Sequence, residues 1–164
     1  MAVELDDLDR GILGLLLRDA RTPVSQIADQ IGLSRPAVAE RIEKLERSGI
    51  LRGTTAVLDP TALGREVTAF VAARGPILDA KQWKQFRELM NSDDEILEVH
   101  TVAGEDCFLV KVRAASTEAL GRLLREQIGT IKGVRSTRTT IVLRTEKETT
   151  ALPLDDESET KQSR

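Results

Sequence analysis

Three basic side chains in one short stretch have the spacing of a surface that binds nucleic acid. Arg35, Arg41 and Lys44 follow Gly32 and Ser34 and would lie on the outer face of one helix. Small residues at the start of a helix with basic residues beyond them suit a helix that enters the DNA major groove by its N-terminal end. An ordinary helical hairpin with a solvated, charged face is the alternative interpretation.

The stretch 24–49 is predicted to form the helix-turn-helix that would position these side chains. Gly32 breaks the apolar pattern where the chain must turn, because glycine accepts backbone angles that other residues resist. Ser34 is a good N-cap for the second helix, and Pro36 falls in its first turn. The inward faces carry Ile27, Ala28 and Ile31 in the first helix, and Val38, Ile42 and Leu45 in the second.

The flanking segments complete a predicted N-terminal domain over residues 1–59. Apolar residues from Leu5 to Leu16 keep a helical period, which predicts a first helix ending near Ala20. Thr22-Pro23 is expected to cap the next helix, with proline at its first position. Residues 51–59 look extended, so three helices and a short strand predict a winged-helix variant, and residues 60–65 are interpreted as a linker.

Beyond the linker the pattern predicts a ferredoxin-like domain over residues 66–147. Strands are expected at 66–73, 96–103, 107–113 and 134–143, with helices over 79–90 and after Ser116. This βαββαβ order makes the whole chain an α+β protein, whose uncovered sheet face we expect to bury apolar residues against a second copy. Residues 148–164 are expected to be a disordered tail. The apolar strand residues are Val67, Val71, Leu97, Val99, Leu109, Ile141 and Leu143.

The composition of the 164 residues narrows the class of protein. The chain is 40% hydrophobic and 31% charged, and its longest apolar run is too short to span a membrane, so a cytoplasmic protein is expected. The single cysteine excludes an internal disulfide and a cysteine-based zinc cluster, and we expect neither a metal nor a cofactor. The net charge is −3, whereas residues 33–53 hold five basic and three acidic side chains, a local charge of +2. So few phosphate contacts predict binding as a dimer or larger assembly.

Four segments of the chain resemble the Lrp/AsnC (feast/famine) family of transcription regulators. The resemblance covers roughly residues 4–147, and its most specific part is the long segment around the predicted helix-turn-helix. It implies an N-terminal domain that binds double-stranded DNA and a C-terminal domain that forms homodimers and higher oligomers. It also implies a small-molecule effector, usually an amino acid, and no enzyme activity. The matching segments are LDDLDRGIL (5–13), IADQIGLSRPAVAERIEKLERSGILRG (27–53), VAGEDCFLVKV (102–112) and IKGVRSTRTTIVL (131–143).

The resemblance also implies two sets of site residues. Arg35 is expected to reach a guanine edge, Lys44 to contact phosphate, and Glu40 either to accept from cytosine or to pair with Lys44. The DNA-binding set is Ser25, Gln26, Ser34, Arg35, Ala37, Glu40, Arg41 and Lys44. The effector-binding set is Thr101, Gly104, Glu105, Asp106, Cys107, Ser136, Thr137, Thr139 and Thr140.

The predicted effector turn departs from the family pattern. The family typically reads G-D-x-D-Y, and this chain reads Gly104-Glu105-Asp106-Cys107-Phe108. Glu105 keeps the first acid, whereas Cys107 replaces the second. A one-residue shift along a strand points a side chain to the other face, so Asp106 is not expected to substitute directly unless the turn is rebuilt. A plain hairpin turn is the alternative interpretation.

Two other functions are compatible with the same residues. An architectural protein that packs DNA with little sequence preference would need the same basic helix. Relatives of the fold also include tetrapyrrole-acting enzymes such as the siroheme decarboxylases, which need histidines. This chain has one histidine, His100, within a predicted strand, and no metal-ligand spacing or phosphate-binding loop, which disfavours catalysis.

Overall fold

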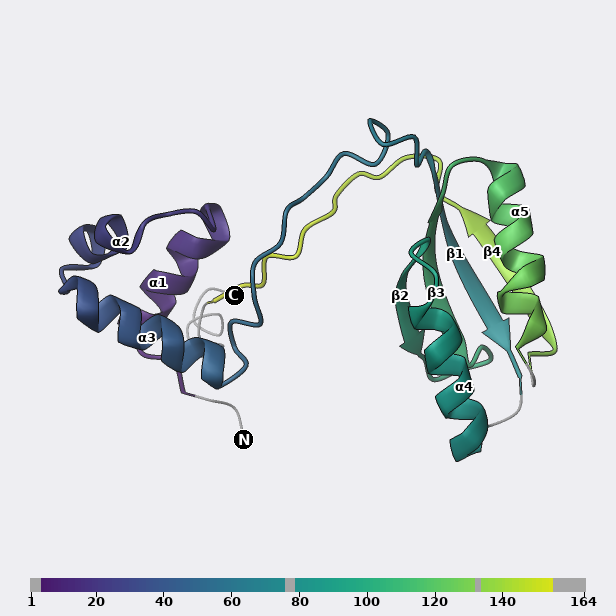
Figure 1. Cartoon of the computed structure of the whole chain (residues 1–164), viewed down its shortest axis with the longest axis horizontal. Coiled ribbons are helices and arrows are strands. Elements are labelled where there is room, and N and C mark those ends of the chain that lie inside the picture. Colours follow the sequence, from purple (N-terminus) through teal and green to yellow (C-terminus); the bar gives the residue numbers. More distant parts are fainter. Residues whose placement is uncertain (1–3, 76–78, 132–133, 155–164) are drawn as a thin grey trace, which may run out of the picture. The chain divides into compact units, whose positions relative to one another are not determined.

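The computed structural model describes residues 4–75, 79–131 and 134–154 as two compact units. One unit holds the chain up to Val57 together with the segment from Glu148 onward, and the other holds Leu58–Lys147. Both units are drawn in Figure 1. The sequence placed residues 148–154 in a disordered tail, yet they group with the N-terminal unit; residues 155–164 of that tail lie outside the described residues.

The N-terminal unit consists of three helices around one small apolar core. They are α1 (Asp7–Arg18), α2 (Val24–Ile31) and α3 (Arg35–Arg47), which confirms the order predicted from the periodicity (Figure 1). The core is formed by side chains at most 2% exposed: Ile12, Ile27, Ala28, Val38 and Leu45. Helix α1 ends at Arg18, two residues before the expected end.

A tight turn joins α2 to α3. Gly32 has φ +76°, and its N–H and that of Leu33 both donate to the carbonyl of Ala28, at 2.9 and 3.1 Å. Ser34 is the N-cap of α3, and its hydroxyl accepts from the N–H of Ala37 at 3.4 Å. The left-handed glycine and the capping serine therefore fix where α3 begins.

Two local predictions for this unit are wrong. Pro23 is the N-cap residue of α2 rather than its first helical residue, and it offers no side-chain cap; the hydroxyl of Thr22 donates to the carbonyl of Asp19 instead. Residues 51–59 form no strand, so α1, α2 and α3 are the regular elements in the described part of this unit, and it has no wing strand. A strand needs a partner to receive its backbone hydrogen bonds, and Val57 is 94% exposed.

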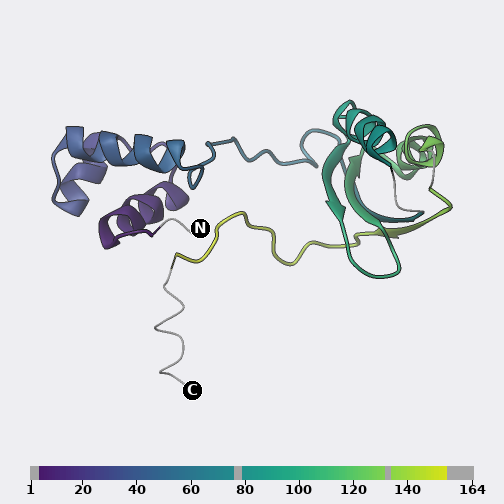
Figure 2. The same ribbon diagram turned by 90° about the horizontal axis from the view of Figure 1, so that it is seen from below.

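The C-terminal unit is a four-stranded antiparallel sheet with two helices. The sheet order is β2-β3-β1-β4, and α4 and α5 cover the same face of the sheet (Figure 2). This is the ferredoxin-like order predicted from the strand and helix pattern. In chain order the elements are β1 (Val67–Arg74), α4 (Ala80–Asn91), β2 (Ile96–Thr101), β3 (Phe108–Ala114), α5 (Thr117–Glu126), the 3₁₀ turn η1 (Ile128–Thr130) and β4 (Ser136–Ile141).

The core of this unit lies between the sheet and the helices. Alternate residues of β1 and β3 point toward the helices, and Val71 pairs with Val110 in the register of these strands. Trp83 and Phe86 from α4 pack against Phe108, with the Phe86 and Phe108 rings stacked at 4.5 Å. The inward residues of α5, Leu120 and Leu123, close the other end of the core.

The expected apolar character of the uncovered face is only partly present. Val67, Val71 and Val99 lie on the helix side, because they alternate with the residues that face outward. The outward positions include a charged pair, in which Lys111 donates to Glu98 at 3.0 Å. Three apolar residues of the expected set are exposed: Leu97 by 50%, Ile141 by 44% and Leu143 by 97%.

Candidate nucleic-acid interface and effector hollow

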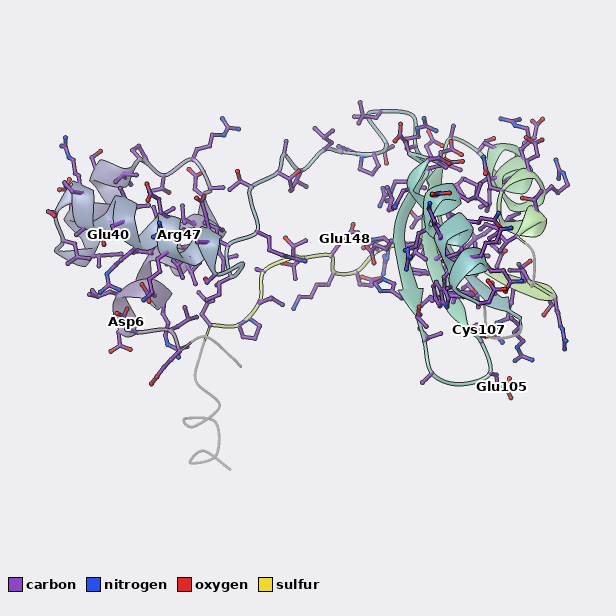
Figure 3. The ribbon with its side chains drawn as sticks, turned by 60° about the horizontal axis from the view of Figure 1, so that its bottom comes forward. Asp6, Glu40, Arg47, Glu105, Cys107 and Glu148 are labelled. Atoms are coloured by element: carbon purple, nitrogen blue, oxygen red, sulfur yellow. The ribbon has the colours of Figure 1, made fainter. Side chains whose placement is uncertain are left out.

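The outer face of α3 presents several of the predicted DNA-binding side chains to solvent. Arg35 and Lys44 are exposed, and within the described part of the chain neither forms an ion pair. Glu40 is exposed and does not pair with Lys44, so that alternative is not realised; Figure 3 labels Glu40 and Arg47 on this helix. The arrangement leaves two cations available to an incoming phosphate or base edge.

The remaining predicted readers flank this face. Ser34 is exposed at the start of α3 and Ala37 is half-buried behind it. Gln26 is exposed and Ser25 half-buried in the first turn of α2. The helix-turn-helix therefore places the N-terminal ends of α2 and α3 in the same unit, as the residue spacing predicted.

Arg41 is held differently from the other basic residues of α3. One nitrogen of its guanidinium, Nη1, lies 2.7 Å from Oδ2 of Asp6 and 2.7 Å from Oδ1 of Asp9. The Asp9 side chain is only 4% exposed, and Asp6 is also the N-cap of α1, accepting from the N–H of Asp9 at 2.7 Å. Arg41 therefore joins α1 to α3, a structural role that competes with its predicted role in reading DNA.

The charges of this cluster support one another. The hydrogen bonds that the Arg41 guanidinium donates to Asp6 and Asp9 raise the pKa of Arg41. The N–H of Asp9 and then the guanidinium of Arg41 lower the pKa of the Asp6 carboxyl. The shifts of Asp6 and Arg41 therefore both favour the charged form of the group.

A polar hollow of about 250 Å³ lies at one end of the sheet in the C-terminal unit. Asp106 is its central charged group: its carboxylate accepts from Nε of Arg74 at 3.0 Å and from Nη2 of Arg138 at 3.0 Å. Arg74 also pairs with Glu105, at the outer end of the turn between β2 and β3 (Figure 3). The hydrogen bond to Asp106 is the largest cause of a raised pKa of Arg74, and the negative charge of Glu105 is the next. The residues that line the hollow are Ala72, Arg74, Asp106, Ser136, Thr137 and Arg138.

Three of the nine predicted effector residues line this hollow: Asp106, Ser136 and Thr137. The alternation argument against Asp106 does not apply, because β3 begins only at Phe108 and Asp106 belongs to the turn. Cys107 is tied back to the end of β1, its N–H donating to Ala73 and its thiol to Gly75. The others that do not line it are Thr101, Gly104, Glu105, Thr139 and Thr140.

Sequence reasoning missed the two arginines that dominate the hollow. Neither Arg74 nor Arg138 is in the predicted effector-binding set, although that set includes Thr137 and Thr139 on either side of Arg138. The signal was the strand register: once β1 and β4 pair, Ala72 faces Arg138 and Arg74 faces Ser136. That pairing joins residues more than sixty positions apart, so no local pattern reveals it.

The residues that could have supported catalysis lie in ordinary surroundings. His100 is exposed, and its Nε2 lies 3.1 Å from Oε2 of Glu98. Within the described ranges there is no group of three or more His, Cys, Asp or Glu residues placed to hold a metal ion. The described helices also include none long and apolar enough to cross a membrane.

Two family models match the chain, one over the three N-terminal helices and one over the sheet domain. The AsnC-type helix-turn-helix domain matches residues 5–46, and the Lrp/AsnC ligand binding domain matches residues 68–152. The first range contains α1, α2 and α3, and the second contains most of the sheet and both of its helices. The fold and these matches define a helix-turn-helix DNA-binding regulator with an appended ligand-binding domain.

Characterised proteins are similar over nearly the full length. The chain is 38% identical to the HTH-type transcriptional regulator FL11 of Pyrococcus abyssi, over 94% of this chain and 99% of that protein. It is 36% identical to the regulatory protein AsnC of Escherichia coli strain K12, over 85% and 90%. The solved structure of E. coli AsnC has a TM-score of 0.82 at 33% identity, over 92% of this chain and 100% of that chain. The chain belongs to the Lrp/AsnC family of transcriptional regulators.

Proposed function

We propose that this regulator reads specific DNA sites with the exposed face of α3 and responds to a small effector at the polar hollow. The DNA-binding part of the proposal rests on the exposure of Arg35 and Lys44 and on their availability for contact with DNA. Both are exposed on a helix whose start is fixed by Gly32 and Ser34, and neither has an ion-pair partner within the described residues. Arg35 suits a paired contact to guanine, and Lys44 a contact to phosphate.

The effector part of the proposal rests on the charges of the hollow. Arg74 and Arg138 offer guanidinium donors to a carboxylate, and Asp106 offers an acceptor to an ammonium group. These are the two groups that an amino acid carries, and charge-assisted hydrogen bonds are the strong ones. A hollow of about 250 Å³ admits a ligand smaller than a typical drug. A fold neighbour, the regulator NMB0573 of Neisseria meningitidis, 24% identical with a TM-score of 0.85, was solved as its own complex with L-Met.

The regulator is proposed to act as an oligomer. The whole chain has a net charge of −3, so one helix-turn-helix with a local charge of +2 supplies few phosphate contacts. Two copies would double those contacts and fix the spacing of two half-sites. The exposed apolar residues of the two edge strands, Leu97 on β2 and Ile141 on β4, are candidates for the contact between copies.

Selection of bound duplexes from a random DNA pool tests this function directly. Enrichment of paired half-sites separated by about one helical turn, roughly 10 base pairs, is the expected result. Recovery of an unenriched pool would instead favour the architectural alternative, in which DNA is packed without sequence preference. Repeating the selection with each of the twenty amino acids, and titrating each by calorimetry, tests the effector part. Heat of binding from none of them would contradict it.

A further inference from the structure

The segment after the sheet returns to the N-terminal unit and contacts α1. Residues 148–154 group with the three helices, and the half-buried side chain of Leu154 packs against their apolar core. The guanidinium of Arg10, on the first turns of α1, donates to the carbonyl of Leu154. The helix-turn-helix model covers only residues 5–46 and the ligand-binding model ends at residue 152, so neither includes this contact.

The side chain of Leu154 lies beside Gly14 of α1. A Cβ atom built on Gly14 would lie 4.0 Å from Cδ1 of Leu154, so the leucine reaches the helix at ordinary van der Waals distance. Leu152, two residues earlier, is 76% exposed and makes no comparable contact with the core.

We propose that residues 148–154 are a working part of the DNA-binding unit, with Leu154 as a positioning residue for α1. Helix α1 in turn supports α3, because Asp6 and Asp9 hold Arg41 and because Ile12 shares the core with Val38. Seating of Leu154 therefore restricts the helix on which α3 rests. The surface on α1 beside Gly14 is a docking site, and its occupant is the C-terminal segment of this chain.

A matched pair of substitutions in the full chain tests the proposal. Leu154→Asp places a charge against the apolar core, whereas Leu152→Asp adds the same charge to the same segment at an exposed position. Hydrogen exchange of the α1 amides should rise roughly tenfold or more in Leu154→Asp and stay at the wild-type rate in Leu152→Asp. Unchanged exchange in β1 and β3 would show that the C-terminal unit remains folded.

Binding to the duplex recovered from the random pool gives the second readout, and it alone rests on the proposed function. Leu154→Asp should weaken DNA binding several-fold more than Leu152→Asp. Leu154→Met should leave both hydrogen exchange and DNA binding at the wild-type level, because it conserves apolar volume. Equal exchange in the two aspartate variants would overturn the docking of the segment. Faster exchange in Leu154→Asp with equal DNA binding would overturn its positioning role. A wild-type chain that enriches no duplex would contradict the proposed function, while the exchange result would still decide the docking.

Discussion

Two arginines in the two units face similar partners in different surroundings. Arg41 and Arg74 each pair with two carboxylates, and their partners raise the pKa of both guanidinium groups. In the N-terminal unit the Asp9 side chain is 4% exposed, and Arg41 itself is 27% exposed. In the C-terminal unit the Asp106 side chain is 19% exposed and that of Glu105 83%, and the hollow beside Asp106 is open to solvent.

This difference in burial separates a structural ion pair from a group that is available to a ligand. A buried carboxylate that loses its partner stays unsatisfied, so the Arg41 cluster is expected to be permanent. Exposed pairs contribute little to stability because water and salt compete for both partners. Arg74 and Arg138 are therefore expected to exchange Asp106 for a ligand carboxylate at small cost, which suits a site that must bind and release an effector.

The largest expected effect is loss of the buried partner in the N-terminal unit. Asp9→Ala leaves the guanidinium of Arg41 without its buried acceptor, and we expect the free energy of unfolding to fall by about 2 kcal/mol. Urea denaturation followed by circular dichroism measures this. Asp7→Ala is the control, since Asp7 is exposed in the same helical turn. Equal losses in the two variants would show that only helix-dipole effects are at work and that the Arg41 cluster adds nothing.

The comparison extends along α3, where Arg41 is held by two acids and Arg35 forms no ion pair with any residue that the structure describes. Arg35→Ala should reduce the preference for the selected duplex over random DNA by about 2 kcal/mol, because a paired contact to guanine is lost. Lys44→Ala should weaken binding to both DNAs by similar factors, because phosphate contacts carry no sequence information. Fluorescence anisotropy with both duplexes at one salt concentration measures this. Equal losses of preference in the two variants would remove Arg35 from the readers.

The elements that the sequence predicted well are those defined by neighbouring residues. Gly32, Ser34 and the apolar spacing of α3 act within one or two helical turns, so the helix-turn-helix was predictable from short patterns. The contacts that decide the roles of the arginines are not local. Arg41 meets an acid 35 residues away and Arg74 one 32 residues away, and only folding brings them together.

The strand predictions show the same difference between local patterns and long-range contacts. The alternation over 66–73 and 107–113 found β1 and β3 to within one residue, because these strands have partners on both sides. Residues 51–59 have a similar extended pattern but no partner, and they form no strand. Alternation therefore states that a segment could be a strand, whereas pairing decides whether it becomes one.

A smaller effect is expected from the exposed acid of the Arg41 cluster. Folding lowers the pKa of Asp6 below its ordinary value of 3.8, so its ionised form stabilises the fold. That contribution is complete above the unfolded pKa and is lost as the pH falls through the lower folded pKa. Asparagine is also a good N-cap, so Asp6→Asn removes the charge and keeps the cap. Melting temperatures should be lower for Asp6→Asn from about pH 5 to 7 and should converge with the wild type at lower pH. A gap that stayed constant down to pH 2 would assign the effect to shape rather than to charge.

The smallest effect on stability is expected at the hollow. A substitution there tests whether the Asp106 cluster differs in role from the Arg41 cluster. Asp106→Ala removes the shared partner of Arg74 and Arg138, whose side chains are 44% and 70% exposed, so the free energy of unfolding should change by less than about 0.5 kcal/mol. Binding of whichever amino acid gives a calorimetric signal with the wild type should weaken at least roughly tenfold, because its ammonium group loses a charged acceptor. A loss of stability as large as that of Asp9→Ala would show that Asp106 holds the fold together. The hollow would then be a structural ion cluster like that of Arg41, and the effector would have to bind elsewhere.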